Sequence, residues 1–472
     1  MLNYPVIIQG GLGAGVSSWL LARTVSQIGQ LGVVSGTALD VILARRLQTG
    51  DPGGHLWRAM QHFPVPEMAQ RILDTFFISG GKKDKNAFKK VSMYSQNPNS
   101  FLQELTVVAN FVEVFLAKEG HEGVVGINFL EKIQLPTLFS LYGAMLAGVD
   151  YVLIGAGIPR EIPGVLDKFA NHEEASLKMY VEGAGSGDTY RIRFDPKKLI
   201  QKVLPELKPP KFLGIISSVT LAIALLRKAT GKVDGFVIEN LTAGGHNAPP
   251  RGKLHLNAKG EPLYGKKDKV DFEKIKSLGL PFWIAGSYGS PEKLKEALAL
   301  GAKGIQAGTS FAFSRESALS EEIKQKLLQK TVRGEGVVFT DPKASPTGFP
   351  FKVISMEGSI SEDKEYLDRT RICDLGYLRH IYKKKDGSLG YRCPSEPIES
   401  YIRKGGSPED VIGRKCLCNG LMANIGLPQL QENGYIEKPI VTAGDDYKFL
   451  ARFLKNVEST YSARDVIRYL LE

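Results

Sequence analysis

Eight short apolar segments, separated by stretches of helical periodicity, constrain the fold of this chain more than any other feature. Most of them run into glycines at their carboxyl ends. Apolar segments that alternate with helices are typical of a parallel sheet. Eight such units predict an α/β fold, a closed (β/α)8 TIM barrel. The expected strands are Val6–Gly11, Gly32–Thr37, Val124–Phe129, Tyr151–Gly157, Phe212–Ser217, Gly235–Asn240, Pro281–Ser287 and Gly304–Ser310.

The last two expected strands both end in small residues. The first ends in Ala285-Gly286-Ser287, and the second passes through Gln306-Ala307-Gly308-Thr309. Small side chains let the backbone N–H groups approach an anion, and the loops after the last two barrel strands are the usual phosphate site of this fold. The tandem arrangement therefore favours a phosphate site over two ordinary turns.

The spacing of the strands also indicates how the chain is divided. Residues 1–330 are expected to form the barrel, with insertions at about 40–100 and 160–210. Within the second insertion, Leu177–Gly183 and Thr189–Phe194 flank a Gly-Ser-Gly-Asp turn and predict a hairpin. Residues 331–472 are charged, richer in Pro and Gly, and contain all four cysteines. We expect them to form a C-terminal extension of mainly helices and loops that packs on the barrel.

The formal net charge of +11 raises the question of a polyanionic partner. The basic residues are spread in short groups, such as Lys266-Lys267 and Lys383-Lys384-Lys385, without an RNA-binding aromatic motif or a basic amphipathic helix. We therefore expect no nucleic acid and no membrane partner. The apolar runs are short and interrupted by glycine, and the first strand begins near residue 6. These features predict a cytoplasmic protein with a small-molecule substrate; a homodimer is a further expectation.

Two strand ends carry polar side chains suited to a ring-shaped ligand. Asn128 interrupts the apolar run of the third strand, and its amide offers both a donor and an acceptor to a flavin or nicotinamide edge. Capping of the next turn is the alternative role for this residue. After the sixth strand, Ala243-Gly244-Gly245-His246 combines two flexible glycines with an imidazole that can move a proton near neutral pH.

The order of these motifs resembles the nitronate monooxygenase (2-nitropropane dioxygenase) superfamily of FMN-binding TIM barrels. The resemblance is carried by IIQGGLGAG, Gly126–Asn128, the AGGH run, Ala285–Ser287 and Gln306–Phe311, and it covers roughly Val6–Phe313. The superfamily also contains flavin-dependent enoyl-acyl-carrier-protein reductases and the enoyl reductase components of polyunsaturated fatty acid synthases. The insertions and the cysteine-containing tail are most similar to the last group.

The resemblance implies FMN as the cofactor and assigns roles to individual residues. Gly10, Gly11, Leu12 and Asn128 would contact the isoalloxazine ring, and Gly244, Gly245, Gly286, Ser287, Gly308 and Thr309 would hold the phosphate. Glu239, Ala285, Gln306 and Ala307 are further cofactor-binding candidates at the same strand ends. His246 matches a histidine beside the flavin and is the candidate catalytic residue, with ordering of its loop as the alternative.

The resemblance is consistent with two reactions. A catalytic histidine of the family is absent here, and its absence bears on the choice between them. Leu221 lies where the nitronate monooxygenases resembled here have a catalytic histidine, and leucine cannot accept a proton. The candidate functions are the oxidation of nitronates with O2 and the NAD(P)H-dependent reduction of an enoyl thioester, with an acyl carrier protein as the partner of the second. A non-catalytic ligand-sensing barrel is an alternative from another class.

The four cysteines permit two interpretations. Cys373, Cys393, Cys416 and Cys418 fall within 46 residues, and four thiolates could hold zinc or an iron–sulfur cluster. Their spacing is not that of a common metal motif, since Cys416-Leu417-Cys418 is the only close pair. We therefore expect buried, reduced cysteines and no metal.

Overall fold

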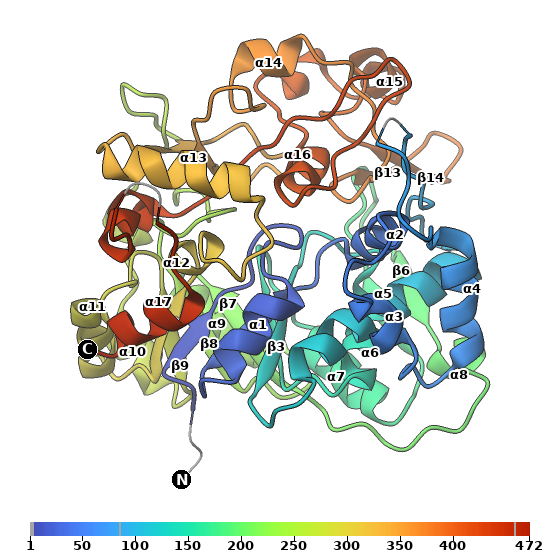
Figure 1. The fold of residues 1–472 in the computed structure, drawn as a ribbon, viewed down its shortest axis with the longest axis horizontal. Coiled ribbons are helices and arrows are strands. Elements are labelled where there is room, and N and C mark those ends of the chain that lie inside the picture. The colour runs from blue at the N-terminus through green and yellow to red at the C-terminus, as the bar shows by residue number, and fades with distance from the viewer. Residues whose placement is uncertain (1–3, 85, 457–458) are drawn as a thin grey trace.

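The computed structural model describes residues 4–84, 86–456 and 459–472, and its centre is a closed barrel of eight parallel strands (Figure 1). The strands follow one another around the barrel in the order β1-β10-β9-β8-β7-β4-β3-β2. The predicted (β/α)8 fold and its eight strands are therefore confirmed. The barrel strands are β1 (Ile7–Gln9), β2 (Leu31–Ser35), β3 (Val125–Leu130), β4 (Tyr151–Gly155), β7 (Lys211–Ile216), β8 (Gly235–Glu239), β9 (Phe282–Ala285) and β10 (Gly304–Ala307).

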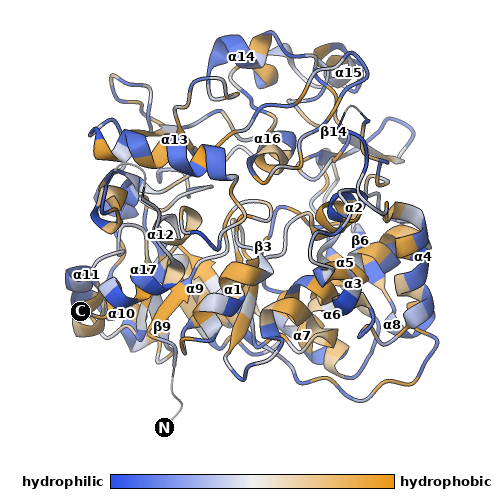
Figure 2. Cartoon of the chain, in the orientation of Figure 1, coloured by the Kyte–Doolittle hydropathy of each residue, from blue (hydrophilic) through white to orange (hydrophobic). Residues whose placement is uncertain are grey.

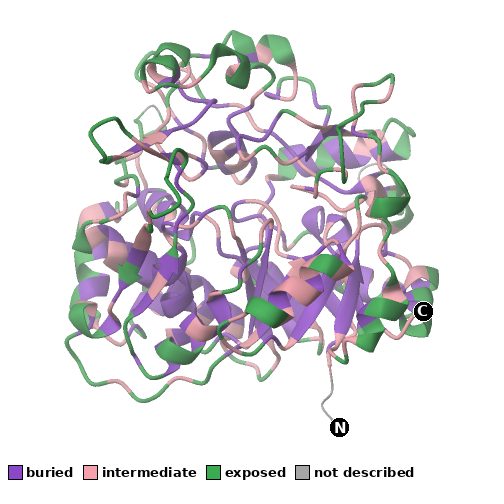
Figure 3. Ribbon diagram, turned by 180° about the vertical axis from the view of Figure 1, so that it is seen from behind, coloured by how far each residue is buried: buried purple, intermediate pink, exposed green. Residues whose placement is uncertain are grey.

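Apolar side chains fill the interior of the barrel. They form one buried cluster that includes Ile8, Val33, Leu153, Val237 and Trp283. The strands are the most apolar ribbons of Figure 2 and are buried in Figure 3, whereas the outer helices expose one face. This is the burial expected when a parallel sheet is covered by helices. The barrel is thus a packed core, and a ligand has to bind at its rim.

Helices surround the barrel strands, and the longest of them, α5 (Ser100–Lys118), packs against α6, α2 and α1. Judged by length and composition alone, α5 is the one helix among the described residues that could cross a membrane, but most of it is buried inside the fold. The other helices before residue 333 are α1 (Trp19–Ser26), α2 (Leu39–Gln48), α3 (His55–Met60), α4 (Pro66–Phe76), α6 (Thr137–Leu146), α7 (Ile162–Ala170), α8 (Pro196–Leu199), α9 (Val219–Lys228), η1 (Lys266–Asp268), α10 (Phe272–Ser277), α11 (Pro291–Ala299), α12 (Thr309–Ala312) and α13 (Glu321–Val332).

Both expected insertions interrupt the barrel pattern. Helices α2, α3 and α4 lie between β2 and α5, within the first insertion. In the second, β5 (Ala175–Lys178) and β6 (Arg191–Phe194) pair antiparallel, with Ala175 opposite Phe194. The predicted hairpin is therefore present, although its strands are shorter than the sequence suggested.

Most of the chain after residue 330 covers the carboxyl ends of the barrel strands, whereas its last helix, α17 (Ala463–Leu470), packs beside the barrel against α1 and α11 (Figure 1). The extension packs around a small apolar cluster that includes Phe351, Ile360, Leu417 and Ile440 and that Ile133 of the barrel region joins. It contains two antiparallel strand pairs, β11–β12 and β13–β14, that the sequence did not predict. Its elements are β11 (Val338–Asp341), β12 (Phe351–Ile354), α14 (Asp363–Leu367), β13 (His380–Lys383), β14 (Leu389–Arg392), α15 (Ile398–Arg403), η2 (Pro408–Val411), α16 (Leu417–Asn424), η3 (Asp445–Phe453) and α17 (Ala463–Leu470).

Candidate functional site

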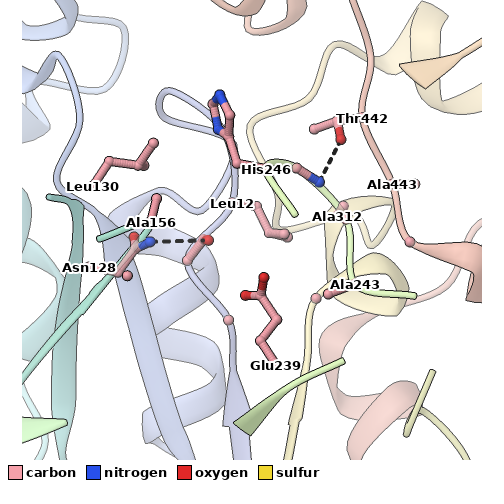
Figure 4. A pocket seen from close by; sticks show the side chains of 18 of the residues that line it. Leu12, Asn128, Leu130, Ala156, Glu239, Ala243, His246, Ala312, Thr442 and Ala443 are labelled. Carbon is pink, nitrogen blue, oxygen red and sulfur yellow. Dashed lines mark hydrogen bonds between the residues drawn. The ribbon is translucent and has the colours of Figure 1, made fainter. Parts of the chain in front are cut away.

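A cavity lies where the carboxyl ends of the barrel strands meet the C-terminal extension (Figure 4). Its wall contains every site residue expected from the sequence. Gly286 and Gly308, which follow neighbouring strands, border the same space. The sequence-derived residues that line the cavity are Gly10, Gly11, Leu12, Asn128, Glu239, Gly244, Gly245, His246, Ala285, Gly286, Ser287, Gln306, Ala307, Gly308 and Thr309.

Asn128 lies on the wall, in the carboxyl half of β3 and beside the loop that follows β1 (Figure 4). Its Nδ2 donates a hydrogen bond to the carbonyl oxygen of Gly11 at 3.4 Å. Its Oδ1 is buried and accepts no hydrogen bond from the part of the chain that the structure describes. Because buried polar atoms are normally paired, this oxygen is a ready acceptor for a ligand N–H group.

Glycines keep the backbone close to the cavity on the side of β1 and β10. A Cβ atom at Gly308 would lie 2.9 Å from Leu12 Cδ2, and one at Gly10 would lie 3.3 Å from the side chain of Gln306. On the side of β9, Gly286 has φ of +87°, which a residue with a Cβ rarely adopts. Larger residues at these positions would fill space at the rim, so the small residues keep the cavity open.

The extension closes the cavity on the side of β8 and β10. The backbone N–H of Gly245 donates to Thr442 Oγ1 at 2.8 Å, a contact drawn in Figure 4, and the N–H of Gly444 donates to Thr309 Oγ1 at 2.9 Å. A Cβ at Gly244 would lie 2.7 Å from the Gly444 nitrogen. The expected phosphate loops are therefore held in place by residues more than a hundred positions later in the chain.

Asp446 is an acidic group on this wall that sequence reasoning missed. The N–H of Gly289 donates to its Oδ2 at 3.2 Å. Burial raises the pKa of this carboxyl group, and a hydrogen bond from the Ser287 side chain and the charge of Arg452 partly offset the rise. A carboxylate here opposes an anion but suits ligand hydroxyl groups as donors. In the sequence, the only signal is the small pair Ala443-Gly444 beside two aspartates.

Glu239, the last residue of β8, points its carboxyl group into the middle of the cavity (Figure 4). The surrounding protein buries this group and raises its pKa from 4.5 to about 8. The carboxyl group is therefore mainly protonated at neutral pH and can donate a hydrogen bond.

His246 belongs to both the cavity wall and the contact with the extension. Its Nε2 lies 2.7 Å from Ser345 Oγ, and its ring contacts that of Phe351 with centroids 4.9 Å apart. Burial lowers the pKa of the imidazole to about 4, so that it is neutral at neutral pH. These contacts join the loop to the extension, and the residue also lines the cavity.

The extension also supplies an aromatic wall that the sequence did not reveal. Tyr377 lines the cavity, and its hydroxyl group donates to Oδ1 of Asp40 on α2. Burial raises the pKa of Asp40 to about 6, and the hydrogen bond from Tyr377 opposes this rise. Residues 337 positions apart are thus in contact. No local periodicity could have indicated this pair.

Leu221 and the cysteines bear on the remaining expectations. Leu221 lies in the first turn of α9 and packs against the apolar core, and it does not line the cavity. Position 221 therefore supplies no proton acceptor to the cavity. The four cysteines are free thiols. Among the described residues, no group of three or more His, Cys, Asp or Glu side chains could hold a metal ion.

Part of the chain matches a known protein family. The family model for nitronate monooxygenase matches residues 201–346, which include β7 to β10 and the glycine-rich loops of the cavity. The expected resemblance to this family is therefore confirmed for that segment.

Curated relatives match a similar fraction of the chain. This chain is 33% identical over 129 residues to a probable nitronate monooxygenase of Bacillus subtilis (strain 168). The matched segment is 27% of this chain and 35% of that protein. The corresponding protein of Staphylococcus haemolyticus (strain JCSC1435) is 29% identical over 129 residues, 27% of this chain and 34% of that one. The match thus spans about a third of each relative.

Solved structures resemble the chain over its length at low identity. FabK from Thermotoga maritima is 15% identical with a TM-score of 0.47, covering 99% of this chain and 92% of that one. A nitroalkane oxidase from Streptomyces ansochromogenes is 13% identical with a TM-score of 0.46, covering 99% and 95%.

Proposed function

We propose that this chain is an FMN-dependent oxidoreductase of the nitronate monooxygenase type. The proposal rests on one observation: glycine-rich strand ends, a buried amide with a free acceptor and a protonated carboxyl group converge on the cavity at the barrel rim. The match of residues 201–346 to the nitronate monooxygenase family supports the same assignment.

The residues of the cavity fit a flavin in the proposal. Asn128 would accept a hydrogen bond from the ring through its unpaired Oδ1, and the glycines on β1 and β10 leave room for a flat ring system. The loops at Gly244, Gly286 and Gly308 would bind the phosphate through backbone N–H groups. Asp446 would accept hydrogen bonds from ribityl hydroxyl groups, which offsets its repulsion of the phosphate.

When bound, FMN supplies the capacity to accept or donate a hydride or single electrons. The protein would contribute orientation and proton handling. Glu239 is mainly protonated and can donate to a polar atom of the ligand, and neutral His246 can accept a proton at the upper wall. The extension covers the rim and reduces the access of water to the reacting atoms.

Two reactions are open to such a site, and different observations favour them. Oxidation of a nitronate with O2 is the activity named in the family model and in the curated relatives. Reduction of an enoyl thioester by NAD(P)H is favoured because Leu221 cannot serve as the proton acceptor of nitronate oxidation. Leu221 is apolar and lies outside the cavity wall. We take nitronate oxidation as the first candidate and enoyl reduction as the second.

Anaerobic mixing distinguishes the two reactions. The purified protein is expected to be yellow, with flavin absorbance near 450 nm. Loss of this absorbance on adding a nitronate alone identifies the oxidase, and loss with NADPH alone identifies the reductase. Binding of FMN with no reduction by either compound would support a ligand-sensing barrel, and a colourless protein that does not take up FMN would contradict the proposal.

The proposal includes the setting of the enzyme. We propose that the enzyme acts on a small-molecule substrate in the cytoplasm and that it forms a homodimer. For the reductase, the partner would be an acyl carrier protein, and the net charge of +11 favours encounter with an acidic carrier. Salt-dependent reduction of a carrier-bound enoyl thioester, compared with its free thioester, would test this partner.

A further inference from the structure

The four cysteines of this chain converge on one small cavity, although they come from three separate segments. Cys373 lies between α14 and β13, Cys393 directly follows β14, and Cys416 and Cys418 lie at the start of α16. All four side chains line the same cavity, and none forms a disulfide. These are all the cysteines in 472 residues, so their meeting at one point calls for a chemical explanation.

A single metal ion does not explain the arrangement. Zinc needs all of its ligands within about 2.3 Å of one ion. Among the described residues, no group of three or more potential ligands could hold such an ion. In a four-iron, four-sulfide cluster, each of four thiolates binds a different iron atom, so the four sulfur atoms stand further apart around a shared centre. Thiols that surround a cavity without meeting at a point match the second arrangement.

We propose that Cys373, Cys393, Cys416 and Cys418 bind an iron–sulfur cluster. The site is independent of the flavin and of the reaction proposed above. It lies in the extension, but Leu378, Leu417 and Cys418 line both this cavity and the cavity at the barrel mouth. A cluster here would therefore adjoin the proposed flavin site.

The charges near the thiols also suit an anionic cluster. The cationic side chain of Arg379 lines the cavity together with the four thiols. The nearest acidic groups are each paired with a cation. These pairs are Glu437 with Arg369, Glu396 with Lys404, and Asp374 with Arg45. In addition, Nη1 of Arg369 is buried and makes no hydrogen bond to the described residues.

Metal analysis of the full-length wild-type protein tests the proposal. The protein would be purified without oxygen, incubated with ferrous iron and sulfide, and desalted. We expect equal amounts of iron and acid-labile sulfide, about four of each per chain, and a paramagnetic signal after reduction with dithionite. Zinc without sulfide, or a protein that stays free of metal and keeps four titratable thiols, would overturn the proposal.

Single substitutions identify the ligands. Cys373→Ser and Cys418→Ser should each lower the iron and sulfide content at least about tenfold. Met422→Leu is a matched control, since Met422 is fully buried in the same helix α16 but does not line the cavity, and its iron content should be unchanged. Circular dichroism and FMN content report whether each variant is folded. Full retention of iron by both folded serine variants would rule out this site.

Discussion

Gly11 and Asn128 approach each other so closely that a side chain at position 11 would overlap the asparagine. An ideal Cβ atom at Gly11 would lie 2.0 Å from Asn128 Oδ1. The carbonyl oxygen of Gly11 accepts the hydrogen bond from Asn128 Nδ2, which fixes the orientation of the amide. The absence of a side chain on one residue therefore determines where the free acceptor of the other is directed.

Removing this acceptor should weaken FMN binding. We expect Asn128→Ala to raise the Kd for FMN by up to about tenfold, the equivalent of one hydrogen bond. Asn110→Ala is the control, because Asn110 is also a buried asparagine with an unpaired Oδ1 but lies on α5 outside the cavity. Titration of the FMN-free proteins with FMN, followed by fluorescence quenching, measures both constants. An equal loss of affinity in the two variants would show that the amide acts through stability alone.

Glu239 should make the stability of the FMN-free protein depend on pH. Because its pKa is 4.5 in the unfolded chain and about 8 in the folded one, the folded state favours the protonated form. Its contribution to the free energy of unfolding is present below pH 4.5 and is lost as the pH rises through about 8. Urea unfolding between pH 5 and 9 should show this decline in the wild type and a smaller decline in Glu239→Gln. Identical pH profiles would mean that Glu239 is not buried as the structure indicates.

His246 can be tested separately for catalysis and for loop order. His246→Ala should keep FMN bound but slow turnover at least about tenfold, the lower range for a lost acid or base. Ser345→Ala removes the hydroxyl partner 2.7 Å from Nε2 but leaves the imidazole in place. If His246 acts in the reaction, only the first variant should be slow in steady-state assays. Equal rates in both variants would assign the residue a structural role.

The histidine also predicts an acid-sensitive contribution to stability. Its pKa is 6.5 in the unfolded chain and about 4 in the folded protein, so the unfolded state binds the proton more tightly. The free energy of unfolding should therefore fall as the pH falls from 6.5 towards 4. Urea unfolding over this range should show a shallower decline in His246→Gln than in the wild type.

Gly444 tests whether the extension forms part of the cofactor site. A Cβ at this position would lie 2.7 Å from the backbone oxygen of Thr242 and 3.1 Å from the nitrogen of Gly244. Gly444→Ala should cost about 1–3 kcal/mol of stability through overpacking and should release FMN more readily. Gly187→Ala is the control, since a Cβ there meets no atom within 4 Å. Thermal unfolding and FMN retention on a desalting column measure the two effects, and unchanged retention in Gly444→Ala would separate the extension from the site.

The sequence by itself determined the barrel and the rim that lines the cavity. Strand and helix periodicities are local properties, so eight apolar segments such as Gly235–Glu239 could be recognised without knowledge of their neighbours. The carboxyl ends of parallel strands meet at one edge of the barrel. Residues as distant in sequence as Gly11 and Gly308 could therefore be assigned to one site before their contacts were known.

Only the tertiary structure decided which parts of the extension reach that site. The hydrogen bond from Gly245 to Thr442, the pairing of Tyr377 with Asp40 and the convergence of the four cysteines all join residues that lie far apart in the sequence. The direction of the His246 ring towards Ser345 is likewise set by the extension. Such contacts depend on how two packed layers fit together, and the path of the intervening loops is not encoded in local patterns.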